Sequence, residues 1–166
     1  MTTPCLPAAD ADPPRAPYGV LVVDDQPAVR EGLARLIACG TPSLRYVVTA
    51  ASIAEAVGAA TRLHPEVVVL DVDLDGEDGL ALMHRLAPDV AVLVLTSHGD
   101  AATRERAARL GALAFIEKHQ PAAELLVAIE RLGQRAATGD EPPGPPGTSS
   151  LPRVAAISAV PAPRGP

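Results

Sequence analysis

Four short apolar runs, each followed by polar residues, restrict the fold more than any other feature of this 166-residue sequence. The runs are continuous, and segments with helical periodicity separate them. Continuous apolar runs of this length are typical of parallel strands that are buried on both faces of a sheet. The pattern therefore predicts an α/β fold, with strands at residues 20–23, 67–70, 92–95 and 113–116.

A fifth strand and five helices complete the pattern. The additional strand is expected at residues 45–50. The first helix has Pro27 in its first turn and ends at Gly40, which we expect to be a left-handed cap. Ser52 and Glu55 have the spacing of a capping box at the start of the second helix. The helices are expected at residues 27–40, from 52 onward, 79–86, 100–111 and 121–135.

Alternating strands and helices predict a doubly wound, flavodoxin-like sheet of five parallel strands in the order 2-1-3-4-5. Ligands of such sheets bind beyond the carboxyl ends of the strands. We expect one ordered domain at residues 18–135. Residues 1–17 and 136–166 are rich in proline, glycine and alanine, so we expect both ends to be disordered, the second as a Pro-rich tail.

Charge and the absence of targeting segments limit the function further. The formal net charge is −6, and the arginines are scattered along the expected helices, so a nucleic-acid surface is not expected. The sequence has neither a signal-peptide pattern nor an apolar run long enough to span a bilayer. We therefore expect a cytoplasmic protein whose two cysteines are reduced thiols.

Polar side chains follow the strands at the edge where ligands are expected to bind. Asp24 and Asp25 follow the first strand, and Asp71 follows the third. If these strands are neighbours, the three carboxylates converge. Two unit charges about 4 Å apart repel by roughly 1 kcal/mol in water and about 4 kcal/mol near a protein surface. Because a hard divalent cation relieves this repulsion, we predict a Mg²⁺ site.

Two further residues extend this site towards phosphoryl chemistry. Thr96 and Lys118 follow the fourth and fifth strands and bring a hydroxyl and an ammonium group to the same edge. Together with Mg²⁺ they can balance the charge on the oxygens of a phosphoryl group. Asp71 is the expected nucleophile, since an aspartate can accept a phosphoryl group as an acyl phosphate.

In this order and at these spacings, the five residues resemble the receiver domain of bacterial two-component response regulators, over residues 18–135. The resemblance implies a signalling domain, not an enzyme, that is phosphorylated on Asp71 by a histidine kinase or phosphotransfer protein. It also implies that Mg²⁺ is held by Asp25, Asp71 and the backbone carbonyl of Asp73. Asp24 is expected to act mainly indirectly.

The resemblance also implies a switch. Thr96 is expected to move towards the phosphoryl group, and Phe115, which has no hydroxyl, is expected to pack inward after it. These movements would change the face of the fourth helix, fifth strand and fifth helix, where a downstream protein effector is expected to bind. A phosphorylation-linked dimer is a further expectation. Asp73 and His98 occupy positions that tune dephosphorylation in the family.

Residues 22–33 resemble the subgroup of nitrate and nitrogen-fixation regulators, in which a helix-turn-helix DNA-binding domain follows the receiver. Residues 136–166 are too few and too rich in proline to form that domain. We therefore expect a stand-alone receiver in two-component or phosphorelay signalling, which acts through another chain and does not itself bind DNA.

Three other interpretations fit part of the pattern. Residues 71–82 begin like a calcium-binding EF-hand loop, but Leu82 stands where a bidentate glutamate is required. An aspartyl-phosphate phosphatase of the haloacid dehalogenase type uses similar chemistry, but the order of its motifs is reversed here. A phosphorylation-independent adaptor of the same fold would differ from a working receiver only in its response to phosphoryl donors.

Overall fold

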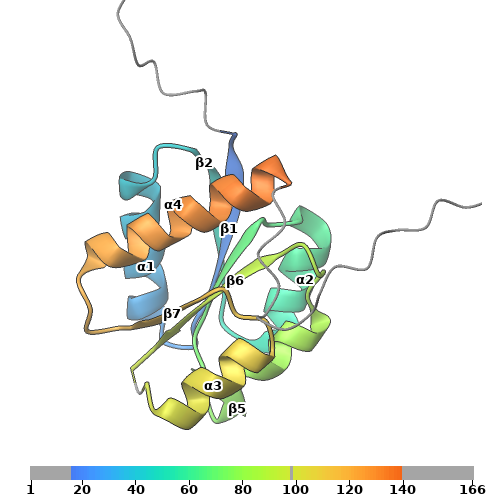
Figure 1. Cartoon of the computed structure of the whole chain (residues 1–166), viewed down its shortest axis with the longest axis vertical. Helices are drawn as coiled ribbons and strands as arrows, with labels where there is room; N and C mark the ends of the chain where they lie inside the picture. The colour runs from blue at the N-terminus through green and yellow to red at the C-terminus, as the bar shows by residue number, and fades with distance from the viewer. Residues whose placement is uncertain (1–15, 98, 140–166) are drawn as a thin grey trace, which may run out of the picture.

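The computed structural model describes residues 16–97 and 99–139 (Figure 1). His98 and the terminal residues 1–15 and 140–166, on which the expected disorder falls, lie outside this range. In the part that is described, every helix is too short or too polar to cross a membrane. The elements are β1 (Tyr18–Val23), α1 (Pro27–Gly40), β2 (Leu44–Ala50), α2 (Ile53–Leu63), β3 (Val67–Leu70), β4 (Asp73–Leu74), β5 (Glu77–Asp78), the 3-10 helix η1 (Gly79–Arg85), β6 (Ala91–Thr96), α3 (Ala101–Arg109), β7 (Ala114–Glu117) and α4 (Ala122–Thr138).

Five parallel strands form the central sheet in the order β2-β1-β3-β6-β7. Since β4 and β5 form a separate hairpin, this is the flavodoxin-like order predicted from the sequence. β1 lies between β2 and β3, so that Val22 pairs with Thr49 on one side and Val69 on the other. The strand order reverses beside β1, and ligands of doubly wound sheets bind at the carboxyl ends of the strands at such a point.

Helices cover both faces of the sheet (Figure 1). α1 and α4 pack on one face, and α2, η1 and α3 pack on the other. Successive residues of β1 alternate between the two cores: Val20 and Val22 belong to the first, Leu21 and Val23 to the second. All six residues of β1 are buried. Burial on both faces explains why this strand has a continuous apolar sequence.

Two helices begin where the sequence predicts. The Ser52 hydroxyl accepts a hydrogen bond from the Glu55 backbone N–H at 3.3 Å, and Asp100 Oδ1 accepts one from the Thr103 N–H at 2.6 Å. The Glu55 carboxylate accepts from the backbone N–H of Ala51 at 2.8 Å, one residue earlier than a standard capping box requires. The side-chain caps therefore start α2 and α3 as expected.

Gly40 does not form the predicted left-handed cap. It is the last residue of α1, and the chain continues through Thr41 in an extended conformation, with φ of −121°. Packing explains the glycine, because a Cβ at this position would overlap the Leu126 side chain of α4. A left-handed cap is found instead after α4, which extends beyond the predicted end at Arg135 to Thr138 and is followed by Gly139 with φ of 70°.

Residues 73–85 also differ from the prediction. The helix expected at 79–86 is the 3-10 helix η1, and a small hairpin precedes it. Asp75 and Gly76 have φ of 53° and 82°, the positive values that a two-residue hairpin turn needs. A Cβ at Gly79 would overlap the backbone carbonyl of Asp71. η1 therefore begins directly against the strand end that carries Asp71.

Close packing of α4 on β1 gives a testable prediction. Gly133 is buried against the ring of Tyr18, and a Cβ at Gly133 would overlap that ring. Overpacking a core typically costs 1–3 kcal/mol, so we expect Gly133→Ala to lower the free energy of unfolding by about 2 kcal/mol. Urea unfolding followed by circular dichroism measures this change.

Gly58, in the middle of α2, is a matched control. A Cβ there would meet no atom within 4 Å. Since alanine is the better helix former, Gly58→Ala should raise the free energy of unfolding by about 0.5–1 kcal/mol. A Gly133→Ala variant as stable as the native chain would contradict the close contact between α4 and β1.

Candidate functional site

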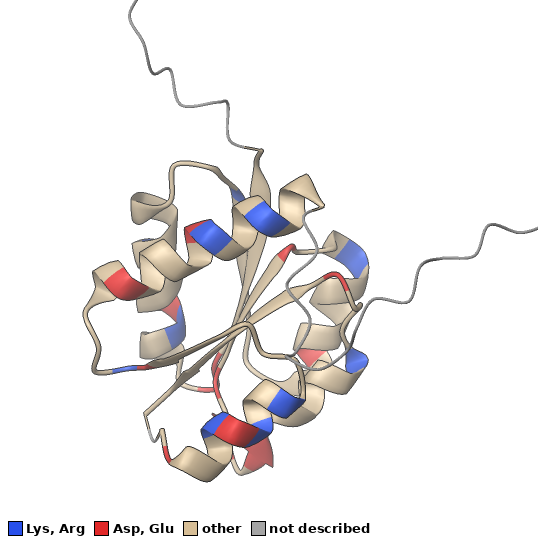
Figure 2. Cartoon of the chain, in the orientation of Figure 1, with Lys and Arg blue, Asp and Glu red and all other residues tan. Residues whose placement is uncertain are grey.

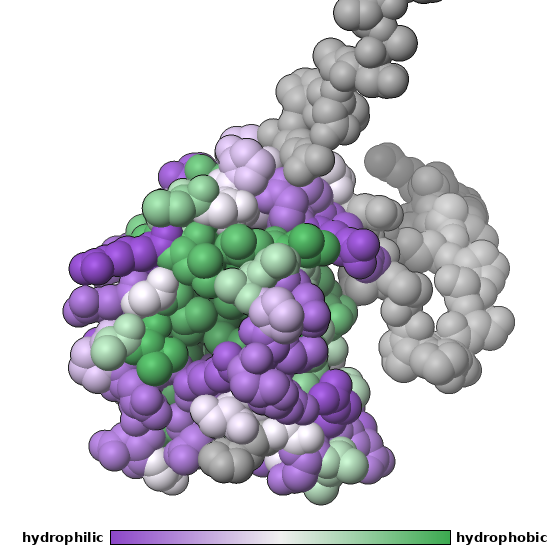
Figure 3. Space-filling view, turned by 90° about the vertical axis from the view of Figure 1, so that its left-hand side faces the viewer, coloured by the Kyte–Doolittle hydropathy of each residue, from purple (hydrophilic) through white to green (hydrophobic). Residues whose placement is uncertain are grey.

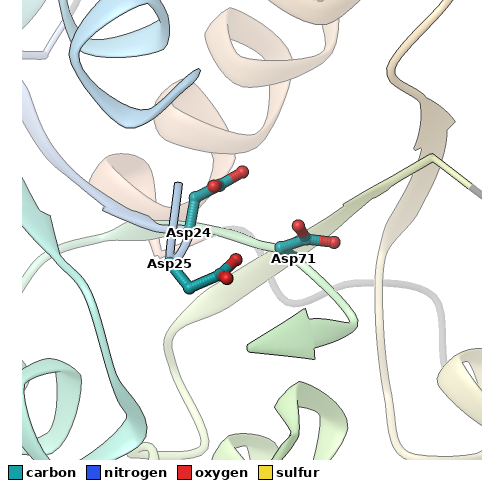
Figure 4. Close-up of side chains that lie close together, drawn as sticks. All are labelled: Asp24, Asp25 and Asp71. Carbon is teal, nitrogen blue, oxygen red and sulfur yellow. The ribbon is translucent and has the colours of Figure 1, made fainter. Parts of the chain in front are cut away.

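Three carboxylates meet at the carboxyl ends of β1 and β3 (Figure 4). Asp24 and Asp25 follow β1, Asp71 follows β3, and the pairing of Val23 with Leu70 places the two strand ends side by side. The Asp71 backbone N–H donates to the Val23 carbonyl at 2.9 Å. One oxygen from each carboxylate lies within 4.8 Å of the others. The sheet topology thus brings together the acidic residues that the sequence separates.

Lys118 reaches the same cluster from β7. Its backbone N–H donates to the Thr96 carbonyl at 2.8 Å, which fixes the end of β7 against β6. Its Nζ donates to Asp24 Oδ2 at 2.7 Å and to Asp71 Oδ2 at 2.6 Å. The side chains of Asp24, Asp71 and Lys118 are only 1%, 7% and 16% exposed. One ammonium therefore bridges two buried carboxylates.

Burial and charge shift two pKa values at this bridge. Burial raises the pKa of the Asp71 carboxyl, and the nearby charge of Asp24 adds to the increase, although the hydrogen bond from Lys118 opposes it. For Lys118, burial alone would lower the pKa. Its hydrogen bonds and its attraction to Asp24 and Asp71 outweigh burial, so the pKa of Lys118 is raised. The ammonium form is therefore favoured at the site.

The raised pKa of Asp71 predicts a pH-dependent stability difference between the native chain and Asp71→Asn without Mg²⁺. A carboxyl whose pKa is higher in the folded state contributes stability below its unfolded pKa and loses that contribution as the pH rises through the folded pKa. The free energy of unfolding of the native chain should therefore fall, relative to that of the variant, from about pH 4 towards neutrality. Urea unfolding in a metal chelator measures both. A pH-independent difference would contradict the pKa shift.

A recess of about 340 Å³ opens beside the three carboxylates. Thr96, at the end of β6, is 4% exposed and lines the recess together with Asp25 and Asp71. Asp73 is exposed and also lines the recess, and its backbone N–H lowers the pKa of the Asp71 carboxyl slightly, against the effect of burial. Four of the expected site residues thus line one opening, and the other two, Asp24 and Lys118, are joined to it through the hydrogen bond from Lys118 to Asp71. The metal-binding role of the Asp73 carbonyl stays a prediction. The remaining lining residues are Gln26, Asp75, Gly76 and Ser97.

Phe115 lies on β7, outside this recess. It is partly buried and packs against the core on the side of α2 and α3. The guanidinium of Arg104, on α3, lies 4.4 Å from the centre of the Phe115 ring and also forms an ion pair with Glu117 at 3.3 Å. The aromatic residue that is expected to act as a switch is therefore covered by a cation from the neighbouring helix. The other position expected to tune dephosphorylation, His98, lies outside the described residues.

Sequence reasoning missed a contact and a compositional signal. Arg30 Nη1 donates to the backbone carbonyls of Asp24 and Asp25 at 2.8 and 3.2 Å. The position of Arg30 one turn into α1 could have indicated this contact with the loop before the helix, because helical side chains lean towards the helix N-terminus.

Lys118 is also the only lysine among the 14 Lys and Arg residues of the chain. Figure 2 shows the other described basic residues, all arginines, distributed over the helices and β2.

The donor set suits Mg²⁺. Hard divalent cations prefer oxygen ligands, and Mg²⁺ is usually held by one or two carboxylates while it keeps several waters. Asp25 and Asp71 line the recess, although Asp71 Oδ2 is also bonded to Lys118. Asp24 does not line the recess, and both of its oxygens have partners, the Gln26 N–H at 2.9 Å and Lys118 at 2.7 Å. This difference supports a direct role for Asp25 and Asp71 and an indirect one for Asp24.

Comparison with known proteins agrees with the site geometry. Residues 20–130 match the family model of the response regulator receiver domain. The chain belongs to this family. The FixJ transcriptional regulatory protein of Azorhizobium caulinodans is 35% identical to the receiver over 124 residues, which are 72% of this chain and 57% of FixJ. The methanol utilization control regulatory protein MoxX of Paracoccus denitrificans is 32% identical over 123 residues, 71% of this chain and 54% of that protein.

Solved structures support the same assignment. The receiver domain of NtrX from Brucella abortus superposes on this receiver with a TM-score of 0.62 and 33% identity, covering 68% of this chain and 96% of that one. The match thus takes in nearly all of an isolated receiver domain. In contrast, this receiver spans only about half the length of FixJ and MoxX.

Proposed function

We propose that this receiver accepts a phosphoryl group on Asp71 in two-component or phosphorelay signalling. The bridge at Lys118 carries the proposal: one ammonium lies 2.6 Å from Asp71 and 2.7 Å from Asp24, beside a recess that is open to a donor. An ammonium in this position can hold a phosphoryl oxygen once Asp71 has reacted. If Lys118 only stabilised the fold through its ion pairs with Asp24 and Asp71, there would be no need for an open recess beside Asp71.

In the proposed reaction, an Asp71 carboxylate oxygen attacks the phosphorus of a phosphohistidine. The new O–P bond forms as the donor P–N bond breaks, and the leaving nitrogen takes up a proton. Mg²⁺, when bound, supplies positive charge to the oxygens of the transferred group. Asp25 and Asp71 would hold the metal, with the Asp73 carbonyl as a third ligand and Asp24 acting through its neighbours.

The proposed signal passes from Thr96 to Phe115. The Thr96 side chain lines the recess, so a phosphoryl oxygen on Asp71 would be within its reach. Movement of Thr96 would open space at β7, and Phe115 would turn further into the core. Since Arg104 contacts Phe115 from α3, this movement would alter the face of α3, β7 and α4. We propose this face as the surface for a protein effector or for a phosphorylation-linked dimer.

The phosphoryl donor requires a separate surface next to the site. The side of the molecule that carries α1 and the first turns of α4 shows a continuous apolar area (Figure 3). Leu33 and Leu36 on α1 and Leu126 on α4 are only partly buried, and Val127 on α4 is 52% exposed. An apolar area of this kind is typical of protein interaction sites. It supports docking of a cytoplasmic histidine kinase or phosphotransfer protein beside Asp71.

Incubation with phosphoramidate, followed by intact mass measurement, tests the proposal. The expected result is a gain of one phosphoryl group per chain that depends on Mg²⁺ and is prevented by a chelator. No gain under any condition would favour a phosphorylation-independent adaptor. Sustained turnover of p-nitrophenyl phosphate would instead indicate a phosphatase, and both results would contradict the proposed receiver function.

A further inference from the structure

Arg30 contacts the acidic loop in an unusual way. One guanidinium nitrogen, Nη1, donates to the backbone carbonyls of two consecutive residues, Asp24 at 2.8 Å and Asp25 at 3.2 Å. These residues form the short connection between β1 and α1, and Pro27, the first residue of α1, has no N–H to donate. Arg30 is partly buried, and its backbone N–H is already bonded to the Gln26 carbonyl. The contact therefore ties the loop to the first turn of the helix.

The carboxylate groups of the same loop have other partners. Asp24 Oδ1 accepts from the Gln26 N–H and Asp24 Oδ2 accepts from Lys118, while Asp25 lines the recess. Arg30 thus brings a positive charge close to the cluster, and its guanidinium donates to backbone oxygens instead of carboxylate oxygens. A cation that paired with those oxygens would compete with a metal ion. A cation on the backbone oxygens stabilises the loop and leaves the carboxylate of Asp25 available.

We propose that Arg30 is a positioning residue for the metal site: it holds the backbone of Asp24 and Asp25 so that the Asp25 carboxylate is pre-arranged to bind Mg²⁺. This inference rests on the proposed function, because it assumes that the acidic cluster binds the metal. Groups that orient metal ligands without touching the ion contribute strongly to affinity, and their replacement typically weakens binding 10- to 100-fold. Arg30 is suited to this role because its planar guanidinium can donate several hydrogen bonds at once.

The single lysine allows a direct test. In protein grown with isotope-labelled lysine, the side-chain NMR spectrum contains only the signal of Lys118, which contacts Asp24 and Asp71. Titration of Mg²⁺ into the native chain should shift this signal. In Arg30→Met, the Mg²⁺ concentration at half-saturation should rise about tenfold. Arg30→Lys, which keeps the charge on a shorter side chain, should give an intermediate value.

Arg35→Met is the matched control. Arg35 lies on the same helix, its side chain is 83% exposed, and its ion pair is with Glu31 at 3.9 Å, away from the loop. In Arg35→Met, the Mg²⁺ concentration at half-saturation should equal that of the native chain. With phosphoramidate, the maximum phosphorylation rate of Arg30→Met at saturating Mg²⁺ should return to the native rate, because a positioning defect acts on affinity and not on the nucleophile.

Two outcomes would overturn the inference in distinguishable ways. If the native signal responds to Mg²⁺ and both Arg30 variants respond at the native concentration, the positioning role is wrong and the proposed metal site stands. If the Lys118 signal of the native chain does not respond to Mg²⁺ at all, the metal site fails and the role of Arg30 fails with it. Should Arg30→Met not fold, the same comparison is made with Arg30→Lys.

Discussion

Asp71→Asn is expected to abolish the gain of a phosphoryl group from phosphoramidate and to leave the fold intact. The amide of asparagine is not a nucleophile for this reaction, and Asp24, the other carboxylate bonded to Lys118, is 1% exposed and does not line the recess. Asparagine has almost the same shape as aspartate and carries no charge. Because burial raises the pKa of Asp71, removal of its charge should not lower stability at neutral pH without Mg²⁺.

Asp89→Asn provides the control for this prediction. Asp89 is an exposed aspartate in the loop before β6, at the opposite end of the sheet from the cluster. Its variant should gain one phosphoryl group as the native chain does. Intact mass and circular dichroism are measured on all three proteins. A well-folded Asp71→Asn chain that still gains a Mg²⁺-dependent phosphoryl group would show that another residue is the acceptor.

Lys118→Ala is expected to cause the largest loss of stability. The substitution leaves Asp24 and Asp71, both nearly buried, without the ammonium that bridges them. Removal of one partner from a buried ion pair typically costs 3–5 kcal/mol, so the free energy of unfolding should fall by about 3 kcal/mol at neutral pH without Mg²⁺. Urea unfolding measures the change. Without the ammonium, the contacts from Lys118 that lower the pKa of Asp71 are lost, so the pKa of Asp71 should rise further.

Two conditions should reduce this loss. Acidification should restore stability, because the pKa of the Asp71 carboxyl is raised in the folded state, and such a group contributes stability at low pH that is lost as the pH rises. Mg²⁺ should also restore stability by supplying positive charge to the same carboxylates. Arg131→Ala, on the exposed surface of α4, is the control and should change stability little. A Lys118→Ala chain as stable as native, with no response to pH or Mg²⁺, would contradict the electrostatic account of the site.

The sheet and the acidic site could be predicted because their signals are local. A strand buried on both faces has a continuous apolar sequence, and a polar residue marks the point where it reaches the surface. Asp71 after β3 and Lys118 after β7 both follow this rule. Their distance in space then follows from strand order, which the short right-handed connections restrict strongly.

The features that were missed have three different causes: a contact between distant segments, a local signal that was obscured, and a contact to backbone oxygens. Gly40 was predicted as a left-handed cap, but a glycine is needed there because a Cβ would overlap the side chain of Leu126 on α4. The hairpin turn at Asp75 and Gly76 has a local signal, an Asp-Gly pair, which the polar character of the loop obscured. Arg30 appeared to be one of several helical arginines, because its acceptors are backbone oxygens that no sequence pattern marks.

The identity of the phosphorylated residue is the central claim, and chemical trapping locates it directly. The native chain is incubated with phosphoramidate and Mg²⁺, treated with borohydride, which reduces an acyl phosphate to an alcohol, and then digested and sequenced by mass spectrometry. We predict one reduced residue, at position 71. Reduction at Asp24 or Asp25 instead, or a phosphate that resists borohydride on serine or threonine, would contradict the proposed site.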